Sequence, residues 1–77
     1  MIEHDHGRVF RYVERFFAKK LRTEWPTVRQ VARAFRWTQQ RVSDAVDGDP
    51  DQRVFLTSYF TDDASLGDHF VESYGET

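Results

Sequence analysis

The 77-residue sequence contains no cysteine, two prolines and four glycines. Without cysteine, neither a disulfide nor a cysteine-ligated metal can hold the fold together. No apolar run approaches the roughly 20 residues that a helix needs to cross a bilayer. We therefore expect no membrane partner and a cytoplasmic protein. The few glycines also form no glycine-rich phosphate-binding loop.

Groups for catalysis or metal binding are also sparse. No nucleophile, base and orienting group recur at a spacing typical of a catalytic site, so we predict that the protein is not an enzyme. His4, Asp5 and His6 lie near Glu3 and are residue types that metal sites use, but they belong to a short segment without periodicity. His69 stands alone in a strand-like run. We therefore predict neither a metal ion nor a cofactor.

Aromatic residues, by contrast, are abundant: seven Phe, two Trp and three Tyr. A domain of this size buries a modest fraction of its surface, and each buried ring contributes a large apolar area. We therefore expect aromatic rings to stabilise the fold, with Phe35 and Trp37 filling the core beside a turn.

The charges are unevenly distributed, although the net charge is only −2. Residues 1–42 contain ten Arg and Lys against four acidic residues, whereas residues 43–77 contain one Arg against nine acidic residues. Such a split indicates two surfaces with different partners. The basic half suits a polyanion such as nucleic acid, which would repel the acidic half.

Apolar residues at spacings of three and four predict a first helix from Gly7 to about Thr23. Its apolar face comprises Val9, Phe10, Val13, Phe16, Phe17 and Leu21. Its opposite face carries Arg8, Arg11, Arg15, Lys19 and Arg22. Residues 1–6 lack this pattern and are predicted to form a flexible arm. Pro26 then breaks the helix, and residues 24–26 are predicted to form a very short strand.

Two capping patterns predict two further helices. Thr27 and Gln30 fit a capping box, in which each side chain satisfies a free backbone donor, and this helix should stop near Arg36. Thr38 is a candidate N-cap for the next helix. That helix should end at residues 47–48, where Gly48 suits a left-handed terminal position.

The last third of the chain predicts a β-hairpin. Residues 54–60 and 69–74 are rich in β-branched and aromatic side chains. The polar residues 61–68 between them form a loop too long for a tight turn. The predicted order is therefore helix, short strand, helix, helix and hairpin.

Residues 27–46, TVRQVARAFRWTQQRVSDAV, have the pattern of two helices joined by a tight turn. The opening T-V-x-x-V-A, the apolar residue before the turn, the Thr opening the next helix and the Val after it strongly resemble the helix-turn-helix of bacterial and phage transcriptional regulators. Arg36 departs from the many members that have Gly in the turn. With the first helix and the hairpin, the chain resembles a winged helix-turn-helix over most of its length.

This resemblance implies an α+β fold of three helices followed by a two-stranded β-hairpin wing. The fold would form a single domain over residues 7–77, with the wing at about 52–74. It also implies sequence-specific binding of double-stranded DNA by a transcriptional regulator, more often a repressor than an activator. Because one recognition helix rarely gives enough affinity, we expect a homodimer.

In such proteins the second helix of the motif enters the major groove with its N-terminal residues leading. The residues expected to contact bases are Thr38, Gln39, Gln40, Arg41 and Ser43. The residues expected to contact phosphates are Thr27, Arg29, Arg33, Arg36 and Arg53.

The predicted wing is acidic where many winged helices carry Arg or Lys. Asp62, Asp63 and Asp68 lie at its tip. A Debye length of about 8 Å does not screen close contacts, so these carboxylates would oppose binding to phosphates. We expect the tip to point away from DNA or to contact a protein. An alternative function is therefore a winged-helix interaction module whose acidic hairpin binds a basic protein partner.

Overall fold

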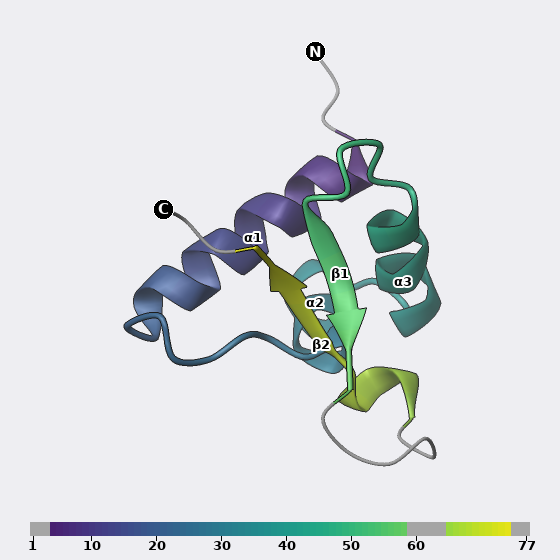
Figure 1. The fold of residues 1–77 in the computed structure, drawn as a ribbon. Helices are drawn as coiled ribbons and strands as arrows, with labels where there is room; N and C mark the ends of the chain where they lie inside the picture. Colours follow the sequence, from purple (N-terminus) through teal and green to yellow (C-terminus); the bar gives the residue numbers. More distant parts are fainter. Residues whose placement is uncertain (1–3, 59–64, 75–77) are drawn as a thin grey trace.

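A computed structural model describes residues 4–58 and 65–74. The elements are α1 (Asp5–Lys19), α2 (Val28–Phe35), α3 (Gln39–Asp47), β1 (Val54–Thr57), the 3-10 helix η1 (Leu66–Asp68) and β2 (Phe70–Ser73). β1 and β2 pair antiparallel, from Val54 opposite Ser73 to Thr57 opposite Phe70. In Figure 1 the hairpin lies in front of α2, with α1 behind its upper end and α3 at its side. The predicted α+β arrangement of three helices followed by a two-stranded hairpin is confirmed.

The segment before α2 pairs with the edge of β2 that β1 leaves open. The Val71 N–H donates to the Pro26 carbonyl at 2.7 Å, and the Val28 N–H donates to the His69 carbonyl at 2.8 Å. The predicted short strand at residues 24–26 is thus reduced to a single bridge, in which Thr27 lies opposite Phe70. These bonds connect the start of α2 to the hairpin.

The core consists of small side chains rather than rings. The buried apolar residues are Val9, Val13, Val28, Val31, Ala32, Val42, Ala45, Val46, Val54 and Val71. Across residues 4–58 and 65–74, no aromatic side chain is fully buried. The partly buried rings of Phe10, Tyr12, Trp25, Phe35 and Trp37 pack around the core. The expectation that Phe35 and Trp37 fill the core is therefore wrong, because short valines let the elements pack closely and leave the rings at the rim.

The start of α1 differs from the sequence prediction. Asp5 and His6, predicted to belong to the arm, lie in the first turn of the helix. A carboxylate is favourable at a helix N-terminus, and Asp5 also pairs with Arg41. The other residues predicted in the arm include 1–3, which lie outside the described residues.

The end of α1 comes earlier than predicted. The Arg22 N–H donates to the Phe17 carbonyl at 2.8 Å, and the Leu21 N–H donates to the Ala18 carbonyl at 3.2 Å. These two bonds form a Schellman closure, with Leu21 left-handed at φ 58°. Leu21 is consequently 85% exposed and does not join the predicted apolar face.

The predicted caps of α2 and α3 are confirmed. The Gln30 N–H donates to the Thr27 hydroxyl at 3.1 Å, and the Thr27 N–H donates to Gln30 Oε1 at 2.8 Å. The Arg41 N–H donates to the Thr38 hydroxyl at 3.1 Å. Local sequence therefore determines where both helices begin.

The turn after α3 differs from the prediction at Gly48. Its φ is −85°, so it is not left-handed. The chain instead leaves the helix through a tighter turn, in which the Asp49 N–H donates to the carbonyl of Val46, three positions earlier, at 3.3 Å. The left-handed residue comes later, at Gln52 with φ 51°.

The hairpin strands are shorter than the runs that predicted them. β1 ends at Thr57 and β2 begins at Phe70, and the predicted loop contains η1, which the sequence patterns did not predict. In the part of the chain that the structure describes, no helix is long and apolar enough to span a membrane.

Candidate nucleic-acid interface

The turn between α2 and α3 closes on Arg36. The Trp37 N–H donates to the Ala32 carbonyl at 2.9 Å, and the Arg36 N–H donates to the Arg33 carbonyl at 3.3 Å. Arg36 is left-handed, with φ 60°. An L-residue pays a steric penalty of about 1 kcal/mol or more in this conformation. The closure nevertheless brings α3 directly after α2 and leaves the Arg36 side chain exposed.

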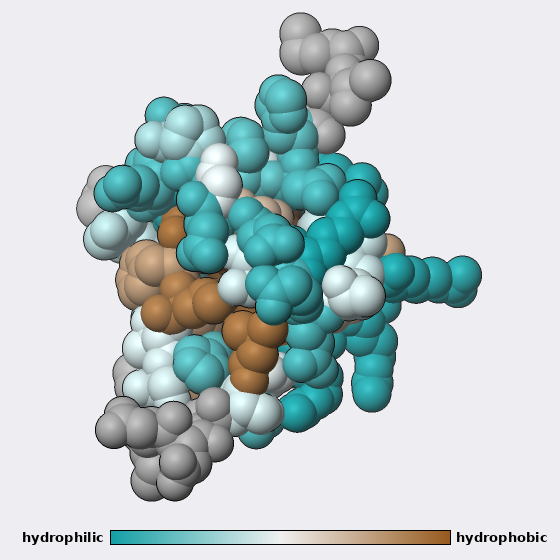
Figure 2. Space-filling view, turned by 90° about the vertical axis from the view of Figure 1, so that its right-hand side faces the viewer, coloured by the Kyte–Doolittle hydropathy of each residue, from teal (hydrophilic) through white to brown (hydrophobic). Residues whose placement is uncertain are grey.

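The outer face of α3 is mostly hydrophilic. Figure 2 views the molecule from the α3 side and shows polar side chains over most of this surface, with apolar ones gathered toward the β1 side. Val42, Ala45 and Val46 bury the inner face of α3. Thr38, the N-cap of α3, and Gln40 in its first turn are exposed. The residues predicted to contact bases therefore lie on or beside an accessible helix start.

The two glutamines of this first turn already have intramolecular contacts. Gln40 Nε2 donates to Asp44 Oδ1 at 2.9 Å. Gln39 is half-buried against Gly67 of η1, where an added Cβ would lie 2.9 Å from Gln39 Nε2. A larger residue at position 67 would therefore require the Gln39 side chain to shift. Gln40 is thus the more accessible of the two predicted base contacts.

Arg41 joins the start of α3 to the start of α1. Its Nε donates to Asp5 Oδ2 at 3.0 Å, and its Nη2 donates to Asp5 Oδ1 at 3.3 Å. These hydrogen bonds hold the pKa of Asp5 below its ordinary value. The Arg41 guanidinium also lies 4.1 Å from the centre of the Trp37 ring. No local pattern predicted the pair, because its members are 36 positions apart.

Arg29 pairs with an acidic residue of the wing. Its Nη1 donates to Asp68 Oδ1 at 2.7 Å, and the Ser65 hydroxyl donates to Asp68 Oδ2 at 2.9 Å. Hydrogen bonds from Arg29 first, and then from Ser65, lower the pKa of Asp68. A residue predicted to contact phosphate thus binds a residue predicted to contact protein. Asp62 and Asp63, the other predicted wing contacts, lie outside the described residues.

The remaining predicted contacts differ in availability. Arg33 and Arg36 are exposed and form no ion pair or hydrogen bond through their side chains within residues 4–58 and 65–74. The Thr27 hydroxyl takes part in the capping box, and Ser43 is half-buried. Arg33 lies in the last turn of α2 and Arg36 in the turn itself, so both precede the start of α3 along the chain.

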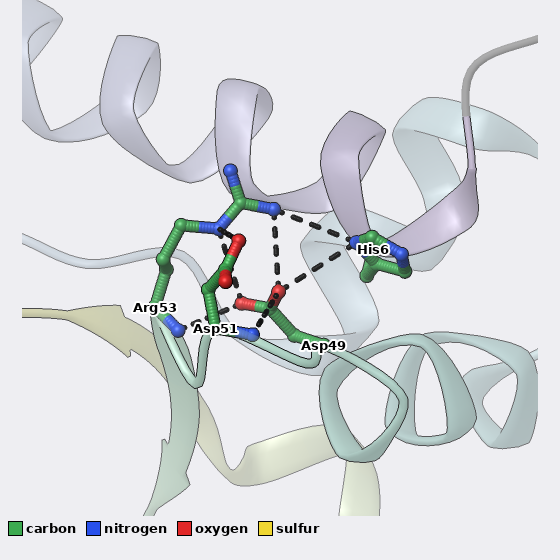
Figure 3. A network of polar contacts seen from close by, with 4 residues as sticks. All are labelled: His6, Asp49, Asp51 and Arg53. Atoms are coloured by element: carbon green, nitrogen blue, oxygen red, sulfur yellow. Dashed lines mark hydrogen bonds and ion pairs between the residues drawn. The ribbon is translucent and has the colours of Figure 1, made fainter.

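Arg53 belongs to a different site, at the far end of α3 (Figure 3). Its Nη2 and Nε donate to the Asp49 carboxylate at 3.2 and 3.3 Å, and its guanidinium lies 4.3 Å from the centre of the Phe10 ring. His6 Nδ1 lies 3.6 Å from Asp49 Oδ1. The structure therefore does not bring Arg53 together with the other predicted phosphate contacts; it fastens the loop after α3 to α1.

The Asp49 carboxylate at the centre of this network is fully buried. Burial by itself would raise its pKa. Hydrogen bonds from the Arg53 side chain, the Arg53 N–H at 2.7 Å and the Asp51 N–H at 3.3 Å outweigh that effect, so its pKa lies below the ordinary value. Sequence reasoning missed Asp49, whose only local signal is an acidic residue in a turn.

The two histidines near the N-terminus contact each other, and His6 also contacts Asp49. His4 and His6 stack with their ring centres 5.2 Å apart. Among the described residues, no three His, Asp or Glu side chains are placed to hold a metal ion. The expected absence of a metal stays a prediction.

No protein-family model, curated protein or solved structure matches the chain. Its function must therefore be inferred from its own residues. Those with the right chemistry for DNA are the exposed start of α3 and the exposed arginines Arg33 and Arg36 that precede it in the chain.

Proposed function

We propose that the protein binds double-stranded DNA through the start of α3 and acts as a sequence-specific transcriptional regulator. One observation carries this proposal: two capped helices are joined by a tight turn, and the exposed first turn of α3 follows two exposed arginines, Arg33 in the last turn of α2 and Arg36 in the turn, whose side chains have no partner among the described residues. A helix presented in this way fits the major groove. Gln40 suits adenine and Arg41 suits guanine, because each can form two hydrogen bonds with that base.

The intramolecular contacts of these side chains are compatible with binding. The Arg41–Asp5 pair is exposed, with 49% and 39% of the two side chains accessible. Solvent-exposed pairs of this kind contribute little to stability, so Arg41 can exchange Asp5 for a base edge. The same holds for Arg29, whose side chain is half-exposed in its pair with Asp68 and can exchange it for a phosphate.

The geometry reduces the number of expected phosphate contacts. Arg53 is held at the other end of α3, and the Thr27 hydroxyl caps α2. Arg29, Arg33 and Arg36 remain as cations. Three phosphate contacts correspond to a slope of about −2.7 for log affinity against log salt concentration, per copy of the chain.

Such a small contact surface favours a homodimer on a palindromic site, because two copies double the number of contacts. Repression is the simpler regulatory role, since occupancy of the site is enough. A cytoplasmic location accords with this role.

The experiment is selection of duplexes from a random pool, followed by titration of the selected site and of an unrelated duplex. Gln40→Ala should weaken binding to the selected site by about 1–3 kcal/mol and leave binding to the unrelated duplex unchanged. Asp47→Ala, which removes another exposed side chain of α3, is the control and should not reduce preference for the selected site. Equal losses on both duplexes would contradict base reading. No preferred duplex and no salt dependence would contradict the proposal itself.

The alternative of a protein-interaction module gains no support from the described wing residues. Asp68, which would bind a basic partner, is paired with Arg29, so that partner would have to displace Arg29 just as a phosphate would have to displace Asp68. Loss of a captured basic protein on charge reversal of Asp62 and Asp63, with DNA binding absent throughout, would favour that alternative.

A further inference from the structure

Four aromatic rings follow one another from α1 to the turn before α3. The ring centres lie 6.1 Å apart for Phe16 and Tyr12, 5.5 Å for Tyr12 and Phe35, and 4.7 Å for Phe35 and Trp37. All four side chains are half-buried, so each ring retains accessible surface. We call these four residues the aromatic row.

Cations lie against this row at both ends. The Arg41 guanidinium is 4.1 Å from the centre of the Trp37 ring. The Arg8 guanidinium is 5.4 Å from the Trp37 ring and 5.2 Å from the Phe35 ring. Lys20 Nζ is 5.8 Å from the Phe16 ring. Cations over ring faces are attracted by the ring quadrupole, so the row and its cations form one continuous surface.

Two hollows lie beside the row and share Tyr12 and Arg15. The first has a volume of about 220 Å³ and is lined by Arg8, Arg11, Tyr12, Arg15 and Phe35. The second, of about 660 Å³, is lined by Tyr12, Arg15, Phe16, Ala18 and Lys19. Among the residues that the structure describes, neither lining contains an acidic side chain, and Ala18 is the only aliphatic residue in the two linings. The hollows therefore combine ring faces with positive charge.

We infer that the aromatic row is a binding site for single-stranded nucleic acid, with unpaired bases in the hollows and phosphates on the surrounding cations. Proteins bind single strands by pairing a positively charged surface with aromatic side chains on which bases stack. Tyr12 is central, because it lines both hollows. Arg15 is the cation shared by both hollows.

The chemistry of the linings favours a single strand over other polyanions. The planar bases of a single strand can stack on the aromatic rings of the linings while its phosphates meet the cations beside them. The bases of an intact duplex are stacked inside the helix and cannot reach the rings. Burial raises the pKa of Tyr12, so its phenol is neutral at physiological pH and does not repel phosphates.

This site shares Arg41 with the duplex-reading role proposed for the start of α3, but its two test residues lie elsewhere. It depends on Tyr12 and Arg15 of α1, which are not among the predicted duplex contacts. Each proposal can therefore fail while the other stands.

The test is fluorescence anisotropy with the whole protein and a labelled oligothymidylate, compared with an abasic strand of equal length. The two strands carry the same phosphates, so the difference in affinity reports base stacking. Binding to oligothymidylate should be about tenfold tighter or more. Equal affinity for the two strands would overturn the inference, as would displacement of the strand by an acidic peptide at the same concentration as by unlabelled strand.

Two variants locate the site. Arg15→Gln should weaken single-strand binding several-fold and lower the salt slope by about 0.7, whereas Arg22→Gln, an equal charge change away from both hollows, should do less.

Tyr12→Leu keeps apolar bulk but removes the ring. It should abolish the preference for bases over the abasic strand while the protein still unfolds cooperatively. If Tyr12→Leu fails to fold, Arg15→Gln decides the matter. Equal effects of Arg15→Gln and Arg22→Gln on single-strand binding would overturn the inference. Duplex binding, by contrast, should respond equally to the two substitutions.

Discussion

The two ends of α3 are each tied to the N-terminal region by an arginine–carboxylate pair, yet the two pairs differ in burial. At the start of α3, Arg41 binds Asp5 with both side chains exposed, at 49% and 39%. At the end of α3, Arg53 binds Asp49, whose side chain is completely buried. The first carboxylate lies on α1 itself, whereas the second lies in the loop that approaches His6 of α1.

Because of this difference in burial, Arg41 is available to bind a ligand, whereas Arg53 stabilises the fold. An exposed pair exchanges partners readily, because water and salt compensate its separation. Removing the partner of a buried carboxylate strongly destabilises the fold, since the charge would remain without compensation in the interior. Arg41 and Arg53 are chemically identical, so their surroundings determine their roles.

The largest effect should come from the buried pair. Asp49→Ala removes the acceptor of two backbone N–H groups and of the Arg53 guanidinium. We expect a loss of about 2–4 kcal/mol in the free energy of unfolding, somewhat below a fully buried pair because Arg53 is partly exposed. Chemical denaturation followed by tryptophan fluorescence measures it. Asp47→Ala, an equal charge change at an exposed position, should leave stability nearly unchanged.

Lowering the pH should reduce the difference in the free energy of unfolding between the wild type and Asp49→Ala. The folded pKa of Asp49 lies below its unfolded value, so its contribution is complete above pH of about 4 and is lost as the pH falls through the folded pKa. The two proteins should therefore become more similar in stability at lower pH. If this difference in the free energy of unfolding were constant from neutral pH to pH of about 2, the carboxylate charge would not stabilise the fold.

Local chemistry explains which parts of the fold could be predicted from the sequence. The caps at Thr27 and Thr38 join residues three positions apart, and the apolar spacing of α2 and α3 identifies their buried faces. Both are encoded within one or two helical turns. The hairpin followed from strand propensity, although its strands are shorter than the propensity suggested.

Features that depend on distant residues could not be predicted in the same way. The pairs Arg41–Asp5 and Arg29–Asp68 join positions 36 and 39 apart. The role of Arg53 depends on the burial of Asp49, which arises only when the loop packs on α1. Aromatic rings were expected inside because they are apolar, but a close-packed valine core leaves room for them only at the rim.

A smaller, two-sided effect is expected at the turn before α3. Arg36→Gly relieves a left-handed arginine and should raise the free energy of unfolding by about 0.5–1 kcal/mol. It also removes one proposed phosphate contact, so affinity for all duplexes should fall and the salt slope should become shallower by about 0.9. Thermal unfolding and a salt titration measure the two effects. Greater stability with unchanged DNA affinity would show that Arg36 is not a phosphate contact.

The smallest effect should come from the exposed pair, and it concerns binding rather than stability. Asp5→Asn weakens the grip on Arg41 and removes a negative charge beside the start of α3. Unfolding should change little, because both partners are exposed, while duplex affinity should rise by about twofold to fivefold.

Asp47→Asn makes the same charge change at the far end of α3, where the side chain is also exposed. If the start of α3 is the DNA-reading end, Asp5→Asn should raise affinity more than Asp47→Asn, because proximity to the phosphates determines the size of the effect. Equal increases in duplex affinity would reflect net charge alone and would show that Arg41 does not contact the DNA. A marked loss of stability in Asp5→Asn would instead show that the exposed pair supports the fold as the buried one does, and the contrast between the two ends of α3 would disappear.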